Sequence, residues 1–454
     1  MLIYLPVEVS RREMVAKTYM ATILAGKGYP VAVFKNTFFE RSDWPSGGLY
    51  IGKNCFANYG FGEEPNYSRM KAKDIRVWHL DEEGGIYVGS SEREWKPMLL
   101  KRLNAAALDS DDKIFTWGEW QRQAYAETGP RCPIHVTGSP NFDMFDPAYS
   151  RALAEFDRQE TDGREGFVLV NTRFSLSNGL MSIKRHLQDG SPSMQQLDRR
   201  SLRIWASQSA ILQYHFISLV HRLSEALPDQ QFVLRPHPAE DPEIYRVLLA
   251  GFPNVSVEWR GDVGSWIRRC RALIHNGCTT AVQAQFAKKP VISYIPHGEA
   301  DGPTPGLPNL IGERCETVEA VIAALQGNRI ADDPEILSRT IAGTNSVEKI
   351  IAMVEAECPP PSSAGERERI VAQVESIARR AALREARERL LRRVLPRRRK
   401  KNRNKGKKFD AAFFSRAVEV CAAAKRQLNS EVDILAPHKE CFLLVPGRAG
   451  RPAG

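Results

Sequence analysis

Short apolar runs alternate with amphipathic stretches along most of the chain. An apolar run bounded by polar turns is typical of a buried strand, and apolar residues at every third or fourth position are typical of a helix that covers a sheet. The strand candidates are Leu2–Leu5, Val31–Phe34, Leu49–Ile51, Ile75–Leu80, Ile114–Trp117, His135–Thr137, Phe167–Asn171, Phe232–Arg235, Val255–Glu258, Ala272–His275 and Val291–Tyr294. Helices fit at about 12–26, 91–106, 119–128, 146–158, 203–226, 242–250, 263–270, 279–288 and 316–326.

The strand candidates fall into two series, separated by the polar stretch Gln159–Glu165. Strands that alternate with helices predict parallel sheets, so we expect an α/β fold of two Rossmann-like lobes with a cleft between them. The expected lobes are residues 1–160 and 166–345. The composition changes after Cys358-Pro-Pro-Pro-Ser-Ser363 to a Glu- and Arg-rich pattern, and residues 346–454 are expected to form a basic helical extension, accessory to the lobes.

The composition is that of an ordinary globular protein. Of the 454 residues, 43% are apolar and 26% are charged, which is enough to bury a core. No stretch approaches 18 uncharged apolar residues, and Glu8 comes too early for a signal-peptide core, so we expect neither a membrane span nor secretion. The 8 cysteines are scattered without a Cys-x-x-Cys pair, which predicts reduced thiols in a cytoplasmic protein, without disulfides or zinc.

The positive charge is concentrated in one region. Residues 366–408 carry 18 Lys and Arg against 5 Asp and Glu, whereas the formal net charge of the whole chain is only +10. The rest of the chain is therefore slightly acidic. A protein that coats nucleic acid would spread its positive charge over the folded part, so this distribution favours an enzyme with a basic extension.

An acidic loop follows one predicted strand of the first lobe. Asp81, Glu82 and Glu83 come directly before two glycines, at a strand end that faces the cleft. Carboxylates so close together raise one another's pKa, which can prepare one of them as a general base near neutral pH. The alternative is a solvated acidic turn.

A second polar segment, Leu234-Arg-Pro-His-Pro-Ala-Glu240, follows a strand of the second lobe. Arg235 and His237 are suited to bind a phosphate leaving group, and the prolines beside His237 restrict the backbone. We count Pro238 and Glu240 among the donor-binding candidates as well. A loop histidine without function is the alternative.

The third segment is Ile274-His-Asn-Gly-Cys-Thr-Thr-Ala281, a strand followed by a turn of small residues and a helix. Asn276, Gly277, Thr279 and Thr280 could present amide and hydroxyl groups to a phosphate at the start of this helix. Capping of the helix by one of the threonines is the alternative.

Two weaker segments complete the candidate cleft. Gly138 lies in Val136-Thr-Gly-Ser-Pro-Asn-Phe-Asp143, and Asn171 and Arg173 lie in Asn171-Thr-Arg-Phe174 at the boundary between the lobes. The acidic cluster Asp109-Ser-Asp-Asp112 precedes a strand instead of ending one, so we interpret it as a solvated turn and expect no bound metal.

Seven short segments occur in a specific order. They are Ile3-Tyr-Leu-Pro-Val-Glu-Val9, Asp81-Glu-Glu-Gly84, Trp117-Gly-Glu-Trp-Gln121, Val136-Thr-Gly-Ser-Pro-Asn-Phe-Asp143, Asn171-Thr-Arg-Phe174, Arg235-Pro-His-Pro238 and His275-Asn-Gly-Cys-Thr-Thr280. In this order they resemble the bacterial surface carbohydrate biosynthesis proteins over about residues 1–300. The resemblance implies a GT-B glycosyltransferase. The acidic loop and the His-Pro pair are also similar to the motif pair of bacterial sialyltransferases and CMP-Kdo transferases.

This resemblance implies roles for individual residues. Glu83 would be the base, with Glu82 as its substitute, and Asp81 would lie in the cleft. His237 would contact the donor phosphate, Pro238 would shape a cytidine pocket, and Thr279 and Thr280 would hold phosphate oxygens. One residue departs from the pattern, because Gln283 stands where similar sequences have a Glu that reaches the ribose. Donor affinity or donor identity is expected to differ accordingly.

The expected function is transfer of a sugar from a nucleotide donor, CMP-activated Kdo or nonulosonate in type, to a cell-surface polysaccharide or lipopolysaccharide. The nucleotide-sugar is a substrate, and no cofactor or nucleic acid is expected. The acceptor would be a glycan or a lipid-linked glycan at the cytoplasmic face of the inner membrane. Arg392–Lys408 could contact anionic lipid there, and a solvated charged segment without a partner is the alternative. One alternative is a polyol-phosphate transferase of the teichoic-acid kind with a CDP-linked donor. The other is a nonenzymatic protein that binds nucleic acid through its basic tail.

Overall fold

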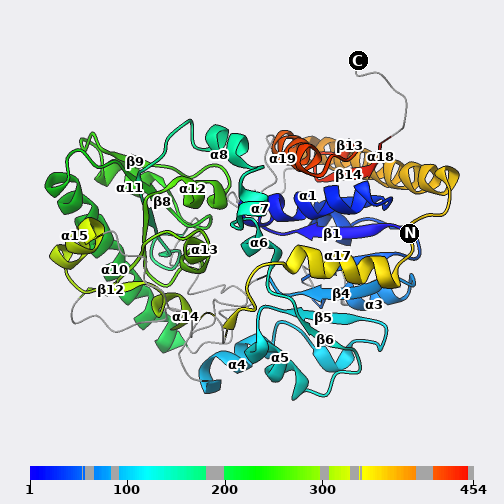
Figure 1. Ribbon diagram of the computed structural model, residues 1–454, viewed down its shortest axis with the longest axis horizontal. Coiled ribbons are helices and arrows are strands. Elements are labelled where there is room, and N and C mark those ends of the chain that lie inside the picture. The colour runs from blue at the N-terminus through cyan, green and yellow to red at the C-terminus, as the bar shows by residue number, and fades with distance from the viewer. Residues whose placement is uncertain are drawn as a thin grey trace.

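The chain folds into two α/β lobes that lie side by side (Figure 1). The computed structural model describes residues 1–53, 55–56, 66–82, 92–179, 199–296, 306–327, 337, 340–394 and 413–447. The basic segment Arg392–Lys408 therefore lies, apart from its first three residues, outside the described part of the chain.

The first lobe is built on an eight-stranded sheet. Its parallel strands are β1 (Ile3–Val7), β2 (Val31–Lys35), β3 (Leu49–Gly52), β4 (Arg76–Leu80), β5 (Lys113–Thr116) and β6 (Ile134–Val136), in the spatial order β2-β1-β3-β4-β5-β6. Side chains alternate between the faces, so Ile3 and Leu5 join one apolar cluster and Tyr4 joins another. The strand order reverses between β1 and β3, and such a reversal leaves a crevice at the carboxyl ends of the strands.

The second lobe is built on a six-stranded parallel sheet. Its strands are β7 (Val168–Asn171), β8 (Phe232–Arg235), β9 (Val255–Val257), β10 (Ala272–His275), β11 (Val291–Tyr294) and β12 (Glu313–Cys315). The spatial order β9-β8-β7-β10-β11-β12 is that of a Rossmann fold, with its reversal between β7 and β10. The predicted fold class of two Rossmann-like lobes is confirmed.

Helices cover both faces of each sheet. In the first lobe and its connection to the second they are α1 (Ser10–Gly26), α2 (Asn36–Glu40), α3 (Asn66–Lys71), α4 (Glu92–Leu100), a 3-10 turn (Ala105–Ala107), α5 (Glu119–Ala126), α6 (Pro140–Asp143), α7 (Pro147–Ser150) and α8 (Ala154–Glu160). In the second lobe they are α10 (Arg199–Ala226), α11 (Glu243–Leu248), α12 (Val263–Arg269), α13 (Thr280–Phe286), α14 (Gly306–Asn309) and α15 (Val318–Gly327). None of the helices in the described ranges has the length and apolarity needed to cross a membrane.

The segment expected as a helical extension is part of the first lobe. It contains α17 (Ser346–Glu357), α18 (Ala364–Val394) and α19 (Phe413–Leu428), but also the strands β13 (Val432–His438) and β14 (Cys441–Pro446). This antiparallel hairpin joins the first sheet through pairing of β14 with β2. Helices α17 and α19 pack with α1 on one face, and α18 packs on the other. The sequence pattern missed the hairpin because its place in the sheet depends on pairing with β2, which is distant in the chain.

The two lobes are joined by a shared apolar cluster and by the returning chain. Trp117 and Phe142 of the first lobe pack with residues of α12 and α13, and Phe142 stacks on Phe286. Where the chain returns to the first lobe, the Ala342 amide donates to the Trp117 carbonyl oxygen at 2.7 Å. These contacts bring the carboxyl edges of the two sheets toward the same region.

Candidate functional site

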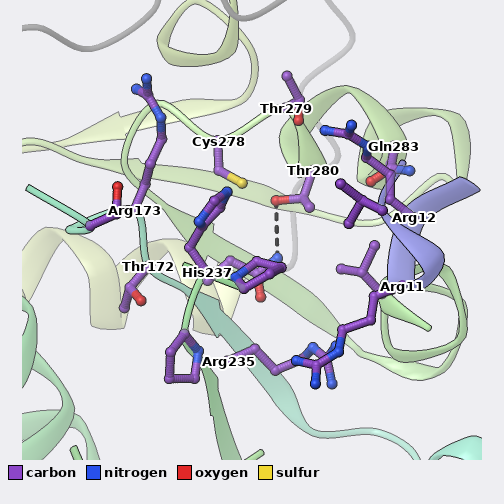
Figure 2. Close-up of a pocket in the computed structure, with 16 residues that line it drawn as sticks. Arg11, Arg12, Thr172, Arg173, Arg235, His237, Cys278, Thr279, Thr280 and Gln283 are labelled. Carbon is purple, nitrogen blue, oxygen red and sulfur yellow. Dashed lines mark hydrogen bonds between the residues drawn. The ribbon is translucent and has the colours of Figure 1, made fainter. Parts of the chain in front are cut away.

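A cavity of about 320 Å³ lies where the strand-order reversals of the two sheets face each other. Figure 2 shows side chains of both lobes around it, with Arg11 and Arg12 of α1 on one side and Arg173 on the other. The lining residues are Val9, Arg11, Arg12, Asn171, Thr172, Arg173, Ser175, Arg235, Pro236, His237, Pro238, Val263, Cys278, Thr279, Thr280 and Gln283. A cavity of this size at such a reversal is suited to a nucleotide-sized ligand.

The second lobe contributes the ends of β7 and β10. The Asn171 side chain donates to the Thr280 hydroxyl at 3.0 Å and so links the loops after these two strands. Between them, Gly277 has a φ of 61° and donates its amide to Asn309 at 2.6 Å. Glycine adopts a positive φ at the lowest cost, which favours this residue at the turn. The turn exposes Thr279 to the cavity.

The loop that carries His237 is held by a buried carboxylate. Glu240 accepts hydrogen bonds from the Tyr245 hydroxyl at 2.6 Å, the Phe174 amide at 2.8 Å and the Thr172 hydroxyl at 2.9 Å. A longer bond of 3.3 Å comes from the His237 amide. Burial raises the pKa of Glu240 to about 7, although these donors oppose the shift. Glu240 thus positions the loop that carries His237. It was predicted to bind the donor, but it is absent from the described cavity lining.

Arg235 is fixed beneath the same loop. Its guanidinium donates to the carbonyl oxygens of Arg260 and Gly261, at 2.6 and 3.2 Å, and lies 5.2 Å from the centre of the Trp266 ring. Burial lowers the pKa of Arg235 to about 10, so the side chain remains cationic at neutral pH. It therefore contributes a fixed positive charge to the cavity wall.

Arg11 and Arg12 are site residues that the sequence reasoning missed. The Arg11 guanidinium lies 4.3 Å from the ring of Trp259 and donates to its carbonyl oxygen, which connects the two lobes. Arg12 donates to the Glu13 carboxylate at 2.8 Å. The available signal was their position, because both follow the first strand at the start of a helix.

The cavity is electropositive. Five basic side chains line it, and none of the described lining residues is acidic. Guanidinium groups bind phosphate oxygens through paired hydrogen bonds, and low-dielectric walls strengthen the attraction. The arrangement is suited to an anionic ligand with one or more phosphate groups.

Asp81 and Glu82 of the acidic loop follow β4 and lie outside this lining. The Asp81 carboxylate accepts from Gln121 at 3.3 Å, and its carbonyl oxygen accepts from the Trp117 indole at 2.7 Å. Glu82 is 5% exposed and lies 3.2 Å from the Lys17 ammonium. Burial is the main reason that its pKa is raised to about 7. Glu83, the predicted base, lies outside the described residues.

The structure brings together many of the residues predicted for the site. The cavity lining contains Asn171, Arg173, Arg235, His237, Pro238, Thr279, Thr280 and Gln283. Asp81, Glu82, Gly138, Glu240, Asn276 and Gly277 are described but are absent from it. Gly138 has a φ of 85° and lies where the chain returns from the second lobe, so that a Cβ there would meet the Gly343 carbonyl oxygen at 2.7 Å. Asn276 is buried behind the turn, with its amide 3.5 Å from the Tyr294 carbonyl oxygen.

The acidic cluster at residues 109–112 is occupied by a lysine. The Lys71 ammonium lies 3.4, 3.1 and 3.2 Å from carboxylate oxygens of Asp109, Asp111 and Asp112. Asp112 also accepts from the Val77 amide at 2.7 Å and from the Tyr67 hydroxyl at 2.6 Å. The cluster therefore has a structural role, because it connects α3 and β4 to the start of β5.

Comparison with solved structures finds matches that extend over most of this chain at low sequence identity. UDP-GlcNAc 2-epimerase from Methanocaldococcus jannaschii, solved with UDP-GlcNAc and UDP, is 11% identical over 78% of this chain and 100% of that chain, with a TM-score of 0.44. The corresponding epimerase from Neisseria meningitidis is 13% identical over 78% and 99%, with a TM-score of 0.44. The wall teichoic acid polymerase TagF is 11% identical over 78% and 88%, with a TM-score of 0.46.

No protein-family model matches the chain, and no curated protein sequence matches it. The resemblance to the surface carbohydrate biosynthesis proteins, including the CMP-Kdo and sialyltransferase motif pair, stays a prediction. Similarities at this level of identity and TM-score carry no information about substrate.

Proposed function

We propose that this protein is a GT-B glycosyltransferase that takes a sugar from a nucleotide donor bound in the cavity between the lobes. The observation that carries the proposal is the cavity itself, which lies at two facing strand-order reversals and is lined by five basic side chains and no described acid. A nucleotide-sugar combines an anionic phosphate with a nucleoside and a sugar, and a site of this charge and volume fits such a molecule.

In the proposed reaction, an acceptor hydroxyl attacks the anomeric carbon while the bond from that carbon to the donor phosphate breaks. The phosphate leaves with the bonding electron pair, and Arg235, His237 and Arg11 neutralise the charge that develops on it. The acceptor proton passes to a carboxylate of the acidic loop, Glu83 or Glu82. Gln283 would hydrogen-bond a donor hydroxyl, as an uncharged substitute for a carboxylate.

The donor we propose is CMP-activated, of the Kdo or nonulosonate type, and the acceptor is a cell-surface glycan or lipid-linked glycan at the cytoplasmic face of the inner membrane. A second candidate function is favoured by the number of basic side chains in the cavity. Arginines 11, 12, 173 and 235 together with His237 could also neutralise a diphosphate, as in a CDP-linked polyol donor. That enzyme would transfer a phosphoryl-alcohol unit instead of a sugar.

A nucleotide panel tests the proposal. Calorimetry with CMP, CDP and UDP, followed by transfer assays with CMP-sugars and CDP-glycerol, should give binding of a cytidine nucleotide and release of CMP from a CMP-sugar. Release of CMP from CDP-glycerol, with no reaction of CMP-sugars, would assign the second candidate. Failure of all three nucleotides to bind would contradict both.

The acidic loop is tested in the same assay. Glu83→Gln and Glu82→Gln should leave nucleotide affinity nearly unchanged, because the role proposed for each concerns the acceptor proton and not the donor. The variant that removes the base should lower turnover by about 10²–10⁴-fold. Near-wild-type turnover in both variants would exclude Glu82 and Glu83 as the base.

A further inference from the structure

Charged residues gather at the strand-order reversal of the first lobe, beside the cavity. Glu8 follows β1, Lys53 follows β3 and Glu82 follows β4, while Arg12, Glu13 and Lys17 come from α1. Three acids and three bases thus meet at the carboxyl edge of the sheet, and only Arg12 of this set lines the cavity described above.

Glu13 organises one end of this cluster. Its fully buried carboxylate accepts from the Glu8 amide at 2.7 Å and from Arg12 at 2.8 Å, and it lies 3.0 Å from the Lys53 ammonium. Lys53 also pairs with the Glu8 carboxylate at 2.9 Å. Glu13 therefore holds the β1–α1 turn, a cavity arginine and a buried lysine together.

Glu82 forms the other end. One carboxylate oxygen lies 3.2 Å from the Lys17 ammonium, which also donates to the Ile51 carbonyl oxygen at 3.2 Å. The second oxygen is buried and has no hydrogen-bond partner among the described residues. A buried carboxylate that pairs with a cation through one oxygen can accept a proton on the other.

Stability alone gives little reason for such a cluster. Taking charges out of water is unfavourable, and the attraction between buried partners often only offsets that cost, so apolar residues of similar volume would serve as well. This cluster extends from Arg12 in the cavity wall to a carboxylate oxygen that has no partner among the described residues, and this points instead to a role in the reaction.

We propose that Lys17 and Glu13 are positioning residues for Glu82, Lys17 by holding it as an ionised proton acceptor and Glu13 by opposing that ionisation while it anchors Arg12. The inference rests on the proposed function, since it makes Glu82 the residue that accepts the acceptor proton. It names Glu82 within the acidic loop and assigns roles to two residues outside the sequence motifs.

The charges that face Glu82 have known signs. Lys17, Lys53 and Arg12 lower its pKa, whereas burial and Glu13 raise it. His79 on the same strand is buried, and its own pKa is lowered to about 3, so it is neutral at pH 7. An opposite charge at close range shifts a carboxyl pKa by about 1–3 units. Removal of Lys17 should therefore raise the pKa of Glu82, and removal of the Glu13 charge should lower it.

The pH dependence of transfer tests this inference in the full-length protein. In Lys17→Met, the acid limb of the kcat/KM profile should move up by about 1–3 pH units. Activity at pH 7 should then fall while activity near pH 9.5 recovers. In Glu13→Gln the same limb should move down, and Lys17→Arg should keep the wild-type limb. If Lys17 and Glu13 had a merely structural role, each variant would lose activity at every pH. The acid limb would then not move up in Lys17→Met and down in Glu13→Gln.

A second measurement needs no turnover. Carbon-13 NMR of labelled glutamate, with the Glu82 signal identified by its loss in Glu82→Gln, should show Glu82 of the wild type titrating near neutral pH and moving in opposite directions in the two variants. An ordinary glutamate titration in the wild type, or equal movement in folded Lys17→Met and Glu13→Gln, would overturn the inference. If CMP, CDP and UDP all fail to bind but these titrations behave as expected, the proposed function is contradicted, whereas the effect of Lys17 and Glu13 on Glu82 is supported.

Discussion

At the scale of single residues, the surroundings of a histidine decide what it can do. His275 is fully buried at the end of β10. Burial lowers its pKa to about 3, so it remains neutral and is part of the packed interior. His237 lies half-buried in the cavity wall, and its backbone amide is held by the buried Glu240. Of these two, only His237 is positioned to meet a ligand, and its assignment to the donor phosphate can be tested directly.

His237→Ala should weaken binding of the free nucleotide by about 10- to 100-fold, because a hydrogen bond to a charged group is lost. Calorimetry on the folded variant is the measurement. His221→Ala is the control, since that ring stacks on Phe252 and bonds to the Leu248 carbonyl oxygen outside the cavity lining. Equal affinities for the wild type and His237→Ala would remove His237 from the donor site.

At this scale, site residues could be predicted from the sequence where a polar residue directly follows a strand. The prediction failed where the direction of a side chain depends on its burial. His237 and Thr279 follow β8 and β10, and carboxyl ends of parallel strands meet at one edge, so their convergence was predictable. Glu240 sits in the same loop, yet it turns inward to accept hydrogen bonds that no spacing rule reveals. Arg11 was missed because its partner Trp259 is far away in the chain.

At the scale of elements, the apolar runs predicted the strands well. All eleven candidate runs coincide with strands β1–β11. The short β12, Glu313–Cys315, was not predicted because two of its three residues are charged. The helix expected at 146–158 is divided between α7 and α8, and Pro147 begins the first of these. Periodicity gives the type of element, and caps and prolines determine where it ends.

The C-terminal hairpin illustrates an element whose place depends on tertiary pairing. Leu443 of β14 is fully buried where the strand pairs with β2, and its register partner is Ala32. Nothing local in the sequence specifies that a strand so distant in the chain will complete the first sheet. A segment that looks like an accessory region is therefore built into the core of the lobe.

This position predicts that Leu443→Asp lowers the free energy of unfolding by about 4 kcal/mol, because it buries an unpaired charge in the sheet. Urea denaturation followed by circular dichroism measures the change. Leu428→Asp is the matched control, because that side chain at the end of α19 is 38% exposed and should change stability by less than about 1 kcal/mol. Similar losses in both variants would contradict a buried role for the hairpin.

At the scale of the whole molecule, charge is divided between two places. The cavity between the lobes holds basic side chains from both lobes. A second accumulation of 11 Lys and Arg lies in Arg392–Lys408, which begins in the last turn of α18 and precedes α19. The last turns of α18 carry the exposed side chains of Leu383 and Leu390 directly before this basic segment. Apolar and basic side chains in succession are typical of segments that bind at a membrane surface.

The basic segment should make the protein co-sediment with vesicles that contain anionic lipid, but not with neutral vesicles. Each Lys or Arg near an anionic surface contributes about 1 kcal/mol, and the attraction should disappear near 1 M salt, where the Debye length is about 3 Å. A variant in which Lys and Arg of residues 397–408 are replaced by Gln tests this expectation and, unlike deletion of the C-terminal region, keeps α19 and the hairpin in the chain. This variant should no longer co-sediment with anionic vesicles and should retain transfer to a short soluble acceptor. Unchanged sedimentation would contradict membrane binding by this segment. Retention of RNA in a binding assay, without vesicle binding, would favour the nucleic-acid alternative.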